Sequence, residues 1–192
     1  MQMEERVRYL FGVHIETKIA LADALSDTIA RAAQRLVNCL LSEGKILIGG
    51  NGGSSANCMH FASSMLHHFE VERPSLPVFN LCSDAAILSS FANENHYGQI
   101  FARQIQALGQ KEDVLLLLTT SGNSDSMLQA LQAANERGMD TIVLGGRDGG
   151  VLANHLGPED IELRVATDSA ARIRELHLFI LHCFCDLIDQ SL

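Results

Sequence analysis

The chain has no apolar run long enough to cross a membrane and only three prolines among its 192 residues. Its longest uninterrupted apolar segment is Val114 to Leu118, whereas a membrane helix needs about 18 such residues. Apolar residues make up 47% and charged residues 19% of the chain, as in a globular protein with a full core. We therefore expect a single domain over residues 1–192 that has no membrane partner.

Basic residues are scarce. The chain has 14 Lys and Arg but 23 Asp and Glu, so its net charge is −9 when His is counted as neutral. Such an acidic surface repels a phosphodiester backbone and disfavours direct binding of nucleic acid. The five cysteines include no C-x-x-C pair, so we expect neither a disulfide framework nor a zinc knuckle. The first residues are charged and lack the apolar segment of a signal peptide. These two features predict a cytoplasmic protein.

Strand-like and helix-like segments alternate from residue 45 onward. Apolar strands are expected at 45–49, 78–81, 113–118, 140–145 and 160–165, and helices at 54–68, 85–93, 100–107, 124–137 and 169–190. Residues 1–43 are expected to form two helices, the second capped by Ser26 and Asp27. This order predicts an α/β fold, a three-layer flavodoxin-like parallel sheet with ligands bound past the carboxyl ends of its strands.

The two terminal helical segments carry more apolar surface than one small sheet needs. The stripe on the last helix is wide and includes Leu176, Phe179, Ile180, Phe184 and Leu187. We therefore expect the long N- and C-terminal helices to pack against other copies of the chain in an oligomer. Packing within one chain is the alternative.

Two strand-to-helix turns carry the main chemical signal. The first, from Gly49 to Ser55, holds four glycines, and the second, from Thr119 to Ser124, holds four hydroxyls. Such turns direct backbone N–H groups and the positive end of a helix dipole at one spot, where a phosphate fits. The alternative is that the hydroxyls only cap helices. Neither turn has the P-loop lysine or a full G-x-G-x-x-G, which favours a small phosphorylated ligand over a nucleotide.

Along its whole length the chain resembles the SIS (sugar isomerase) domain family, in particular the phosphoheptose isomerase branch. The motifs that carry the resemblance are residues 50–54, 59–62, 120–124, 149–150 and 172–177. The resemblance implies a homotetramer with a sugar-phosphate site. The substrate-binding residues that it implies are Asn51, Gly52, Gly53, Ser54, Asn93, Glu94, Thr119, Thr120, Ser121 and Ser124.

The resemblance also implies a zinc site that this chain completes only in part. The isomerases use a His and a Glu four residues apart, together with a Gln and a His eight residues apart. The matching positions here are His60, Ser64, Arg174 and His182. A serine without an activator is no base, and a guanidinium repels a dication. Two histidines fall short of the three protein ligands of a catalytic zinc site, so we expect no cofactor, with zinc at the incomplete site of His60 and His182 as the alternative. We expect no catalytic residue except His182 if activity remains.

Within this branch, proteins of the DiaA type are not enzymes and bind the replication initiator DnaA. Residues 69–77, 156–160 and 183–189 resemble that type. We therefore predict a non-enzymatic protein that binds DnaA, promotes its assembly at the origin and keeps a sugar-phosphate pocket, with Leu192 as the partner-binding residue. One alternative is a phosphoheptose isomerase that converts sedoheptulose 7-phosphate into D-glycero-D-manno-heptose 7-phosphate. Another is a sensor that binds a sugar phosphate.

Overall fold

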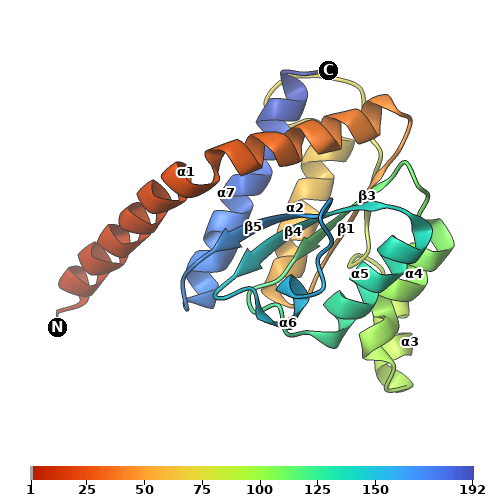
Figure 1. The fold of residues 1–192 in the computed structure, drawn as a ribbon. Coiled ribbons are helices and arrows are strands. Elements are labelled where there is room, and N and C mark those ends of the chain that lie inside the picture. Colours follow the sequence, from red (N-terminus) through yellow and green to blue (C-terminus); the bar gives the residue numbers. More distant parts are fainter. Residues whose placement is uncertain (1) are drawn as a thin grey trace.

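A five-stranded parallel sheet lies at the centre of the structure, which is a computed structural model and describes residues 2–192 (Figure 1). The strands lie side by side in the order β2-β1-β3-β4-β5, which is the flavodoxin-like order. The predicted fold class is therefore confirmed. The strands are β1 (Ile46–Gly50), β2 (Val78–Asn80), β3 (Val114–Leu118), β4 (Asp140–Gly146) and β5 (Ile161–Val165).

Helices cover both faces of the sheet. Helices α1, α2 and α7 pack together on one face, and α4 and α5 pack together on the other (Figure 1). From residue 45 onward the predicted boundaries agree with the structure to within two residues, apart from α6 and the 3-10 helix η1, which are too short to show a periodicity. The helices are α1 (Met3–Leu41), α2 (Gly53–Leu66), α3 (Ala85–Asn93), η1 (Tyr97–Gln99), α4 (Ile100–Leu108), α5 (Asp125–Arg137), α6 (Gly150–Ala153) and α7 (Ala170–Asp189).

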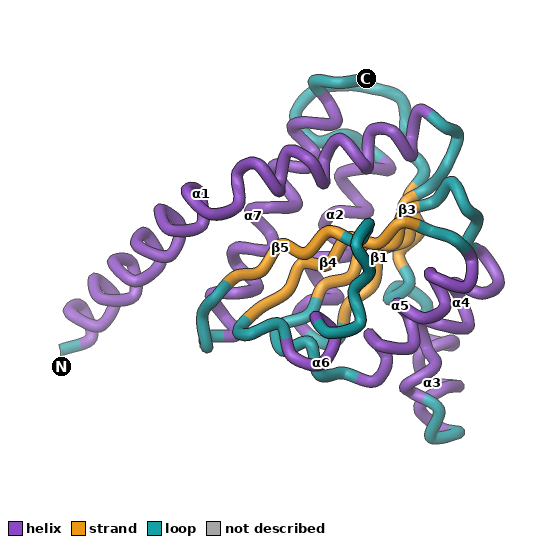
Figure 2. The backbone as a smooth tube through the Cα atoms, viewed as in Figure 1, coloured by secondary structure: helices purple, strands orange, loops and turns teal. Residues whose placement is uncertain are grey.

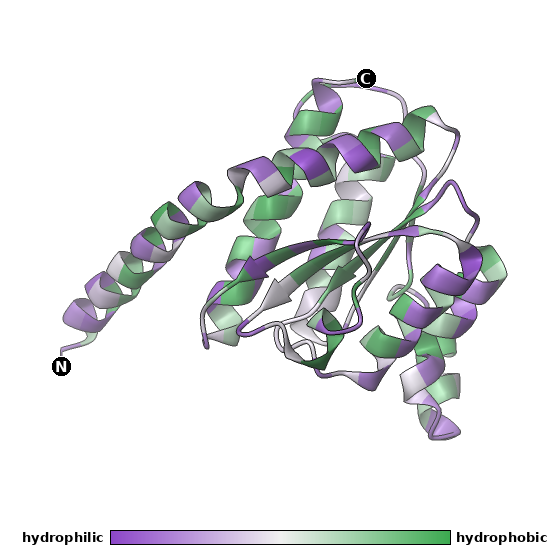
Figure 3. Cartoon of the chain, in the orientation of Figure 1, coloured by the Kyte–Doolittle hydropathy of each residue, from purple (hydrophilic) through white to green (hydrophobic). Residues whose placement is uncertain are grey.

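The core consists of the central strands and the inward faces of the helices that cover them, and the sheet lies at its apolar centre in Figure 3. Every residue of β1 and β3 is buried, as expected for strands covered on both faces. At the sheet edge, β5 instead alternates buried and half-buried residues. Four of the five cysteines are buried and all five are free. Within residues 2–192, no helix combines the length and the apolar character that crossing a bilayer demands.

The N-terminal segment is one continuous helix, so the predicted break at Ser26 is wrong. The Ser26 hydroxyl donates a 2.6 Å hydrogen bond to Ala22 O, one turn back, and therefore lies inside α1 instead of capping a new helix. The buried residues of α1 begin only at Leu21. The part before Leu21 extends beyond the sheet (Figure 2), where Val7, Phe11 and Ile15 are more than half exposed.

A buried ion pair fixes the ends of α2 and α7 relative to each other. Arg73, in the loop after α2, donates to Asp189 Oδ1 at 2.6 Å and to the carbonyl oxygens of Ser64 at 3.1 Å and Met65 at 3.0 Å. The side chains of Arg73 and Asp189 are only 10% and 5% exposed. This anchor positions the two helices that carry His60 and His182.

Candidate functional site

The two glycine- and hydroxyl-bearing turns lie next to each other, because β1 and β3 are neighbours in the sheet. Gly50 at the end of β1 pairs with Leu118 at the end of β3. The chain then enters α2 through Asn51 and Gly52, and α5 through residues 119–124. Gly52 has a φ of +55°, a conformation that glycine adopts without strain. The sheet topology therefore brings both predicted phosphate turns to one edge.

The turn from Thr119 to Ser124 is held in shape by its own side chains. Thr119 Oγ1 accepts a 3.0 Å hydrogen bond from Gly122 N, and Ser121 Oγ accepts a 3.3 Å bond from Asn123 N. The hydroxyl of the N-cap residue Ser124 makes no capping hydrogen bond. Across residues 2–192, the Thr120 hydroxyl likewise has no hydrogen-bond partner. The capping interpretation therefore fails for this turn, which keeps two hydroxyls available for a ligand.

Helix α6 and the glycine before it pack against the same turn. Gly122 O accepts a hydrogen bond from Leu152 N at 2.9 Å, and Asn123 Oδ1 accepts one from Val151 N at 2.9 Å. A Cβ on Gly122, whose φ is +66°, would overlap with Gly149 O. The sequence indicated the glycine pair 149–150 only through the family resemblance. The structure gives the pair a physical role, because the backbone at Gly149 and Gly150 lies so close to the backbone at Gly122 that a side chain there would overlap with it.

Asn51 links the two turns. Its Nδ2 donates to Ser126 Oγ at 2.8 Å, and its Oδ1 accepts from the Tyr97 hydroxyl at 3.0 Å. Burial raises the pKa of Tyr97, so its hydroxyl stays a donor at neutral pH. The side chain of Asn51, predicted to bind substrate, is therefore engaged with protein groups. Sequence reasoning missed Tyr97 and Ser126, because neither belongs to a strand-end turn.

Asn93 and Glu94 lie at the end of α3 and are both exposed. The Glu94 carboxylate is 3.8 Å from His96 Nδ1. In the part of the chain that the structure describes, neither side chain has a hydrogen bond to the turns after β1 and β3. Tyr97, three residues further on, makes the connection to Asn51 instead. Ser54, the remaining predicted binding residue, is buried in the first turn of α2.

His60 on α2 and His182 on α7 face each other. Their Nε2 atoms are 2.9 Å apart and the ring planes are inclined by 62°. A neutral imidazole has one donor and one acceptor nitrogen, so one ring donates to the other in this contact. Burial, followed by the neighbouring His60, lowers the pKa of His182. The predicted pair is therefore brought together by the fold.

The other two predicted metal positions do not join the histidines. The Ser64 hydroxyl donates to His60 O at 3.2 Å and is buried. Arg174 lies against the start of α2, since a Cβ built on Gly53 would come within 2.8 Å of Arg174 Cδ and 2.9 Å of its Nε. No group of three His, Cys, Asp or Glu within residues 2–192 is arranged to hold a metal ion. The donor set therefore does not fit the zinc that the family resemblance implies.

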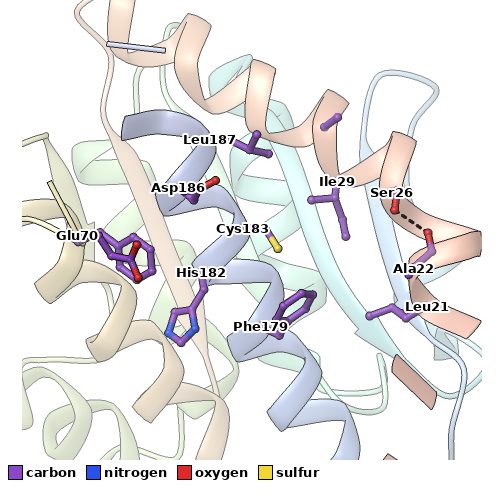
Figure 4. Close-up of a pocket in the computed structure, with 12 residues that line it drawn as sticks. Leu21, Ala22, Ser26, Ile29, Glu70, Phe179, His182, Cys183, Asp186 and Leu187 are labelled. Atoms are coloured by element: carbon purple, nitrogen blue, oxygen red, sulfur yellow. Dashed lines mark hydrogen bonds between the residues drawn. The ribbon is translucent and has the colours of Figure 1, made fainter. Parts of the chain in front are cut away.

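A separate apolar cavity of about 580 Å³ lies between α1 and α7 (Figure 4). Leu21, Ile29, Phe179 and Leu187 form its apolar walls, and His182 lies at its border. None of the residues of the two turns lines this cavity. It is therefore distinct from the sugar-phosphate site predicted at the strand ends.

Comparison with known proteins gives one consistent result. The family model of the SIS domain matches residues 14–146. The chain is 49% identical to the phosphoheptose isomerase of Chromohalobacter salexigens, over 100% of this chain and 98% of that protein. The solved phosphoheptose isomerase of Francisella tularensis superposes with a TM-score of 0.95 at 44% identity, over 99% and 100% of the two chains. The enzyme GmhA from Neisseria gonorrhoeae gives 0.93 at 38% identity, over 98% and 100%.

These relatives overturn the prediction of a non-enzymatic DnaA-binding protein, which is wrong. Curated relatives that match over essentially their full length bear the name of the enzyme. They favour the isomerase alternative, and nothing among them supports DnaA as a partner. Leu192, 52% exposed at the end of the chain, therefore has no assigned role. The prediction erred by giving the changes at Ser64 and Arg174 more weight than the agreement of the remaining chain.

Proposed function

This chain belongs to the SIS domain family, and from that premise we propose that it binds a phosphorylated sugar and interconverts its aldose and ketose forms. The substrate class that we propose is the one in its relatives' name, a heptose phosphate. Sedoheptulose 7-phosphate, converted into D-glycero-D-manno-heptose 7-phosphate, is the specific candidate. The site is the edge of the sheet where the turns after β1 and β3 meet.

The observation that carries the proposal is that the turn before α5 keeps two free hydroxyls, those of Thr120 and Ser124. Ser124 is the N-cap residue of α5, where the helix dipole favours an anion, and Thr120 lies four residues earlier in the same turn; neither hydroxyl is engaged with the protein within residues 2–192. Ser121 Oγ accepts only a long bond from Asn123 N and can still donate its proton. Three hydroxyl donors in a turn that leads into a helix N-terminus suit a phosphate without any lysine.

The proton transfer of the isomerisation falls to the histidine pair in this proposal. Moving hydrogen between adjacent carbons needs a group that takes a proton and a group that returns it. His60 and His182 share one N–H between their Nε2 atoms, so a proton accepted by one ring can be passed to the other. Arg174 adds a fixed positive charge beside the start of α2. No step uses a metal ion, because the donor set does not fit one.

We extend the proposal to the assembly of the chain, which we infer is a homotetramer built through α1. The first half of α1 lies beyond the sheet and exposes Phe11 by 65%, Ile15 by 54% and Ile19 by 61%. Such a row of apolar side chains favours burial against another copy. Sedimentation of the native chain and of a Phe11→Ser, Ile15→Ser, Ile19→Ser variant tests this, and a wild-type monomer at micromolar concentration would contradict it.

The isomerase proposal is tested with purified protein and sedoheptulose 7-phosphate. Calorimetry measures binding and proton NMR measures turnover, both after chelation and again with added zinc. We expect His182→Asn to abolish turnover while binding persists, and Ser121→Ala to weaken binding at least tenfold. His67→Asn, at the exposed end of α2, is the matched control.

The outcomes separate the two parts of the proposal. Binding without turnover in the wild-type protein would refute the isomerase and leave a sugar-phosphate-binding protein. Absence of binding would refute both parts. Turnover that appears only with zinc would refute the metal-free role of the histidine pair.

A further inference from the structure

Two cysteines from distant parts of the chain meet at Gly50, the last residue of β1. Cys82, in the turn after β2, has its Sγ 3.3 Å from Gly50 N and 3.2 Å from Gly50 O. Cys58 lies on α2, and its Sγ would be 3.2 Å from a Cβ built on Gly50. Both thiols are free, and the two residues are 0% and 6% exposed. Two sulfur atoms therefore lie against the residue that precedes Asn51.

The two thiols are not equivalent. The hydrogen bond that Cys58 donates to Cys82 raises the pKa of Cys58, and burial adds to this increase. The same bond lowers the pKa of Cys82, where burial opposes it and the donor at Gly50 N supports it. The thiolate is the reactive form of cysteine, so Cys82 is the nucleophile of the pair and Cys58 the neighbour able to resolve it.

The other three cysteines lack such an arrangement. Burial raises the pKa of Cys39 to about 11, and that of Cys185 to about 12. Burial also raises the pKa of Cys183, although this residue is only half-buried. Cys183 and Cys185 are two residues apart on α7 and point to different sides of the helix. Only the pair at Gly50 joins a lowered pKa to a second thiol in contact.

We propose that Cys58 and Cys82 form a redox modification site, at which a peroxide converts the two thiols into a disulfide. The Cys82 thiolate attacks one oxygen of the peroxide and breaks the O–O bond, which leaves a sulfenic acid and hydroxide. The Cys58 sulfur then attacks the Cys82 sulfur, and its proton leaves with the sulfenic oxygen as water. The hydroxide takes up the proton first lost by Cys82. For hydrogen peroxide, two thiols are oxidised by two electrons and two waters form.

Formation of the Cys58–Cys82 disulfide would change the geometry of the candidate ligand site. The two sulfur atoms must approach to about 2.05 Å, and the Cys82 sulfur must leave its contacts with Gly50 N and O. Gly50 is followed directly by Asn51, which holds both Tyr97 and Ser126. We expect the disulfide to displace Asn51 and weaken binding of the sugar phosphate, a consequence that rests on the proposed function.

The modification itself is tested on the full chain by mass spectrometry. The reduced protein is treated with hydrogen peroxide, the remaining thiols are blocked, and the digest is mapped. We expect a loss of two hydrogens and a crosslink between the peptides that contain Cys58 and Cys82. Cys58→Ser and Cys82→Ser should each abolish the crosslink, whereas the matched control Cys183→Ser should retain it.

The wild-type map decides the proposal by itself, even where a serine variant fails to fold. A crosslink that involves Cys39, Cys183 or Cys185 would overturn it, and so would consumption of the peroxide without any disulfide.

The coupling is measured separately, as the affinity for sedoheptulose 7-phosphate before oxidation, after oxidation and after reduction with dithiothreitol. We expect at least a tenfold loss that reduction reverses. An unchanged affinity would refute the coupling. A reduced protein without affinity would refute the proposed function and leave the mapped disulfide standing.

Discussion

The turn from Thr119 to Ser124 and the facing surfaces of α2 and α7 are two halves of one candidate site, built in different ways. The turn is fixed by backbone, with Gly122 against Gly149 O and its carbonyl bonded to Leu152 N. The helix surfaces instead present side chains, including His60, Ser64 and Arg174, from the regular backbone of α2 and α7. A backbone-built site tolerates few substitutions. A helix surface can change its chemistry while the fold remains the same.

The largest effect should come from breaking the ion pair between Arg73 and Asp189, which fixes α2 and α7 relative to each other. Arg73→Ala removes a nearly fully buried partner and leaves the Asp189 carboxylate without it. We expect a loss of about 3–5 kcal/mol in the free energy of unfolding, the cost of breaking a buried ion pair on one side. Denaturant titration measures it. Arg8→Ala, which breaks an exposed pair with Glu4, should cost less than about 1 kcal/mol. Equal costs for the two variants would argue against the anchor.

The second effect concerns His177, a fully buried residue of α7 whose Nε2 donates to Gly145 O at 2.9 Å. Burial lowers its pKa from 6.5 to about 4. The unfolded chain therefore binds more protons than the folded chain between these values, so stability is full above pH 6.5 and falls as pH drops towards 4. The loss from this group should be about 3 kcal/mol.

Thermal or urea unfolding across this pH range, in wild type and His177→Gln, isolates that contribution. The glutamine keeps a donor for Gly145 O but does not titrate, so its stability should depend less on pH. His155→Gln, which replaces an exposed histidine, is the matched control. An identical pH profile for His177→Gln would contradict the assignment.

The third effect tests the backbone half. Gly122→Ala forces a side chain into a left-handed conformation and into Gly149 O, which should cost about 2–3 kcal/mol and abolish measurable binding of a sugar phosphate. Gly138→Ala has a similar φ of +70° but its nearest neighbour is Lys111 Cγ at 3.7 Å, so it should cost about 1 kcal/mol and leave binding intact. If both variants lose the same stability and bind the sugar phosphate equally, the close approach of Gly122 to Gly149 O is not needed for the site.

The smallest effect is expected at Arg174, because a helix surface can exchange a side chain without disturbing the fold. Arg174→Gln removes a positive charge beside the start of α2 but leaves its carbonyl free to accept from Asn57 Nδ2. We expect affinity for sedoheptulose 7-phosphate to fall about tenfold, with stability unchanged within about 0.5 kcal/mol. Arg172→Gln, two residues earlier, provides the control of equal charge change. Unaltered affinity in Arg174→Gln would remove this residue from the proposed site.

The sequence sufficed for most of the fold, because uniformly apolar strands such as Val114–Leu118 and glycine-bearing turns are local signals. It failed where local signals mislead. Ser26 looks like a cap, but its hydroxyl can also bond one turn back, and the choice depends on the packing of α1 against α7. α6 offers only four residues, too few for any periodicity.

The sequence predicted the two turns of the candidate site, but not the side-chain hydrogen bonds that connect them to other elements. Thr120, Ser121 and Ser124 could be proposed from the sequence because they lie in a turn that directly follows a strand. Tyr97 was missed because its role comes from a single contact with Asn51, across 46 residues of chain. The meeting of His60 and His182 came from family resemblance, and no spacing in the sequence would have given their 2.9 Å contact.

The pairing of β1 with β3 also bears on when the protein can first recognise a ligand during its synthesis. Ile46 on β1 pairs with Val114 on β3, so a ribosome must release well over half of the chain before these two strands can align. Until then the two turns are separate, and neither has its neighbour. A sugar phosphate that binds as proposed would therefore bind only after β1 and β3 have paired, and its binding would favour the folded state by mass action.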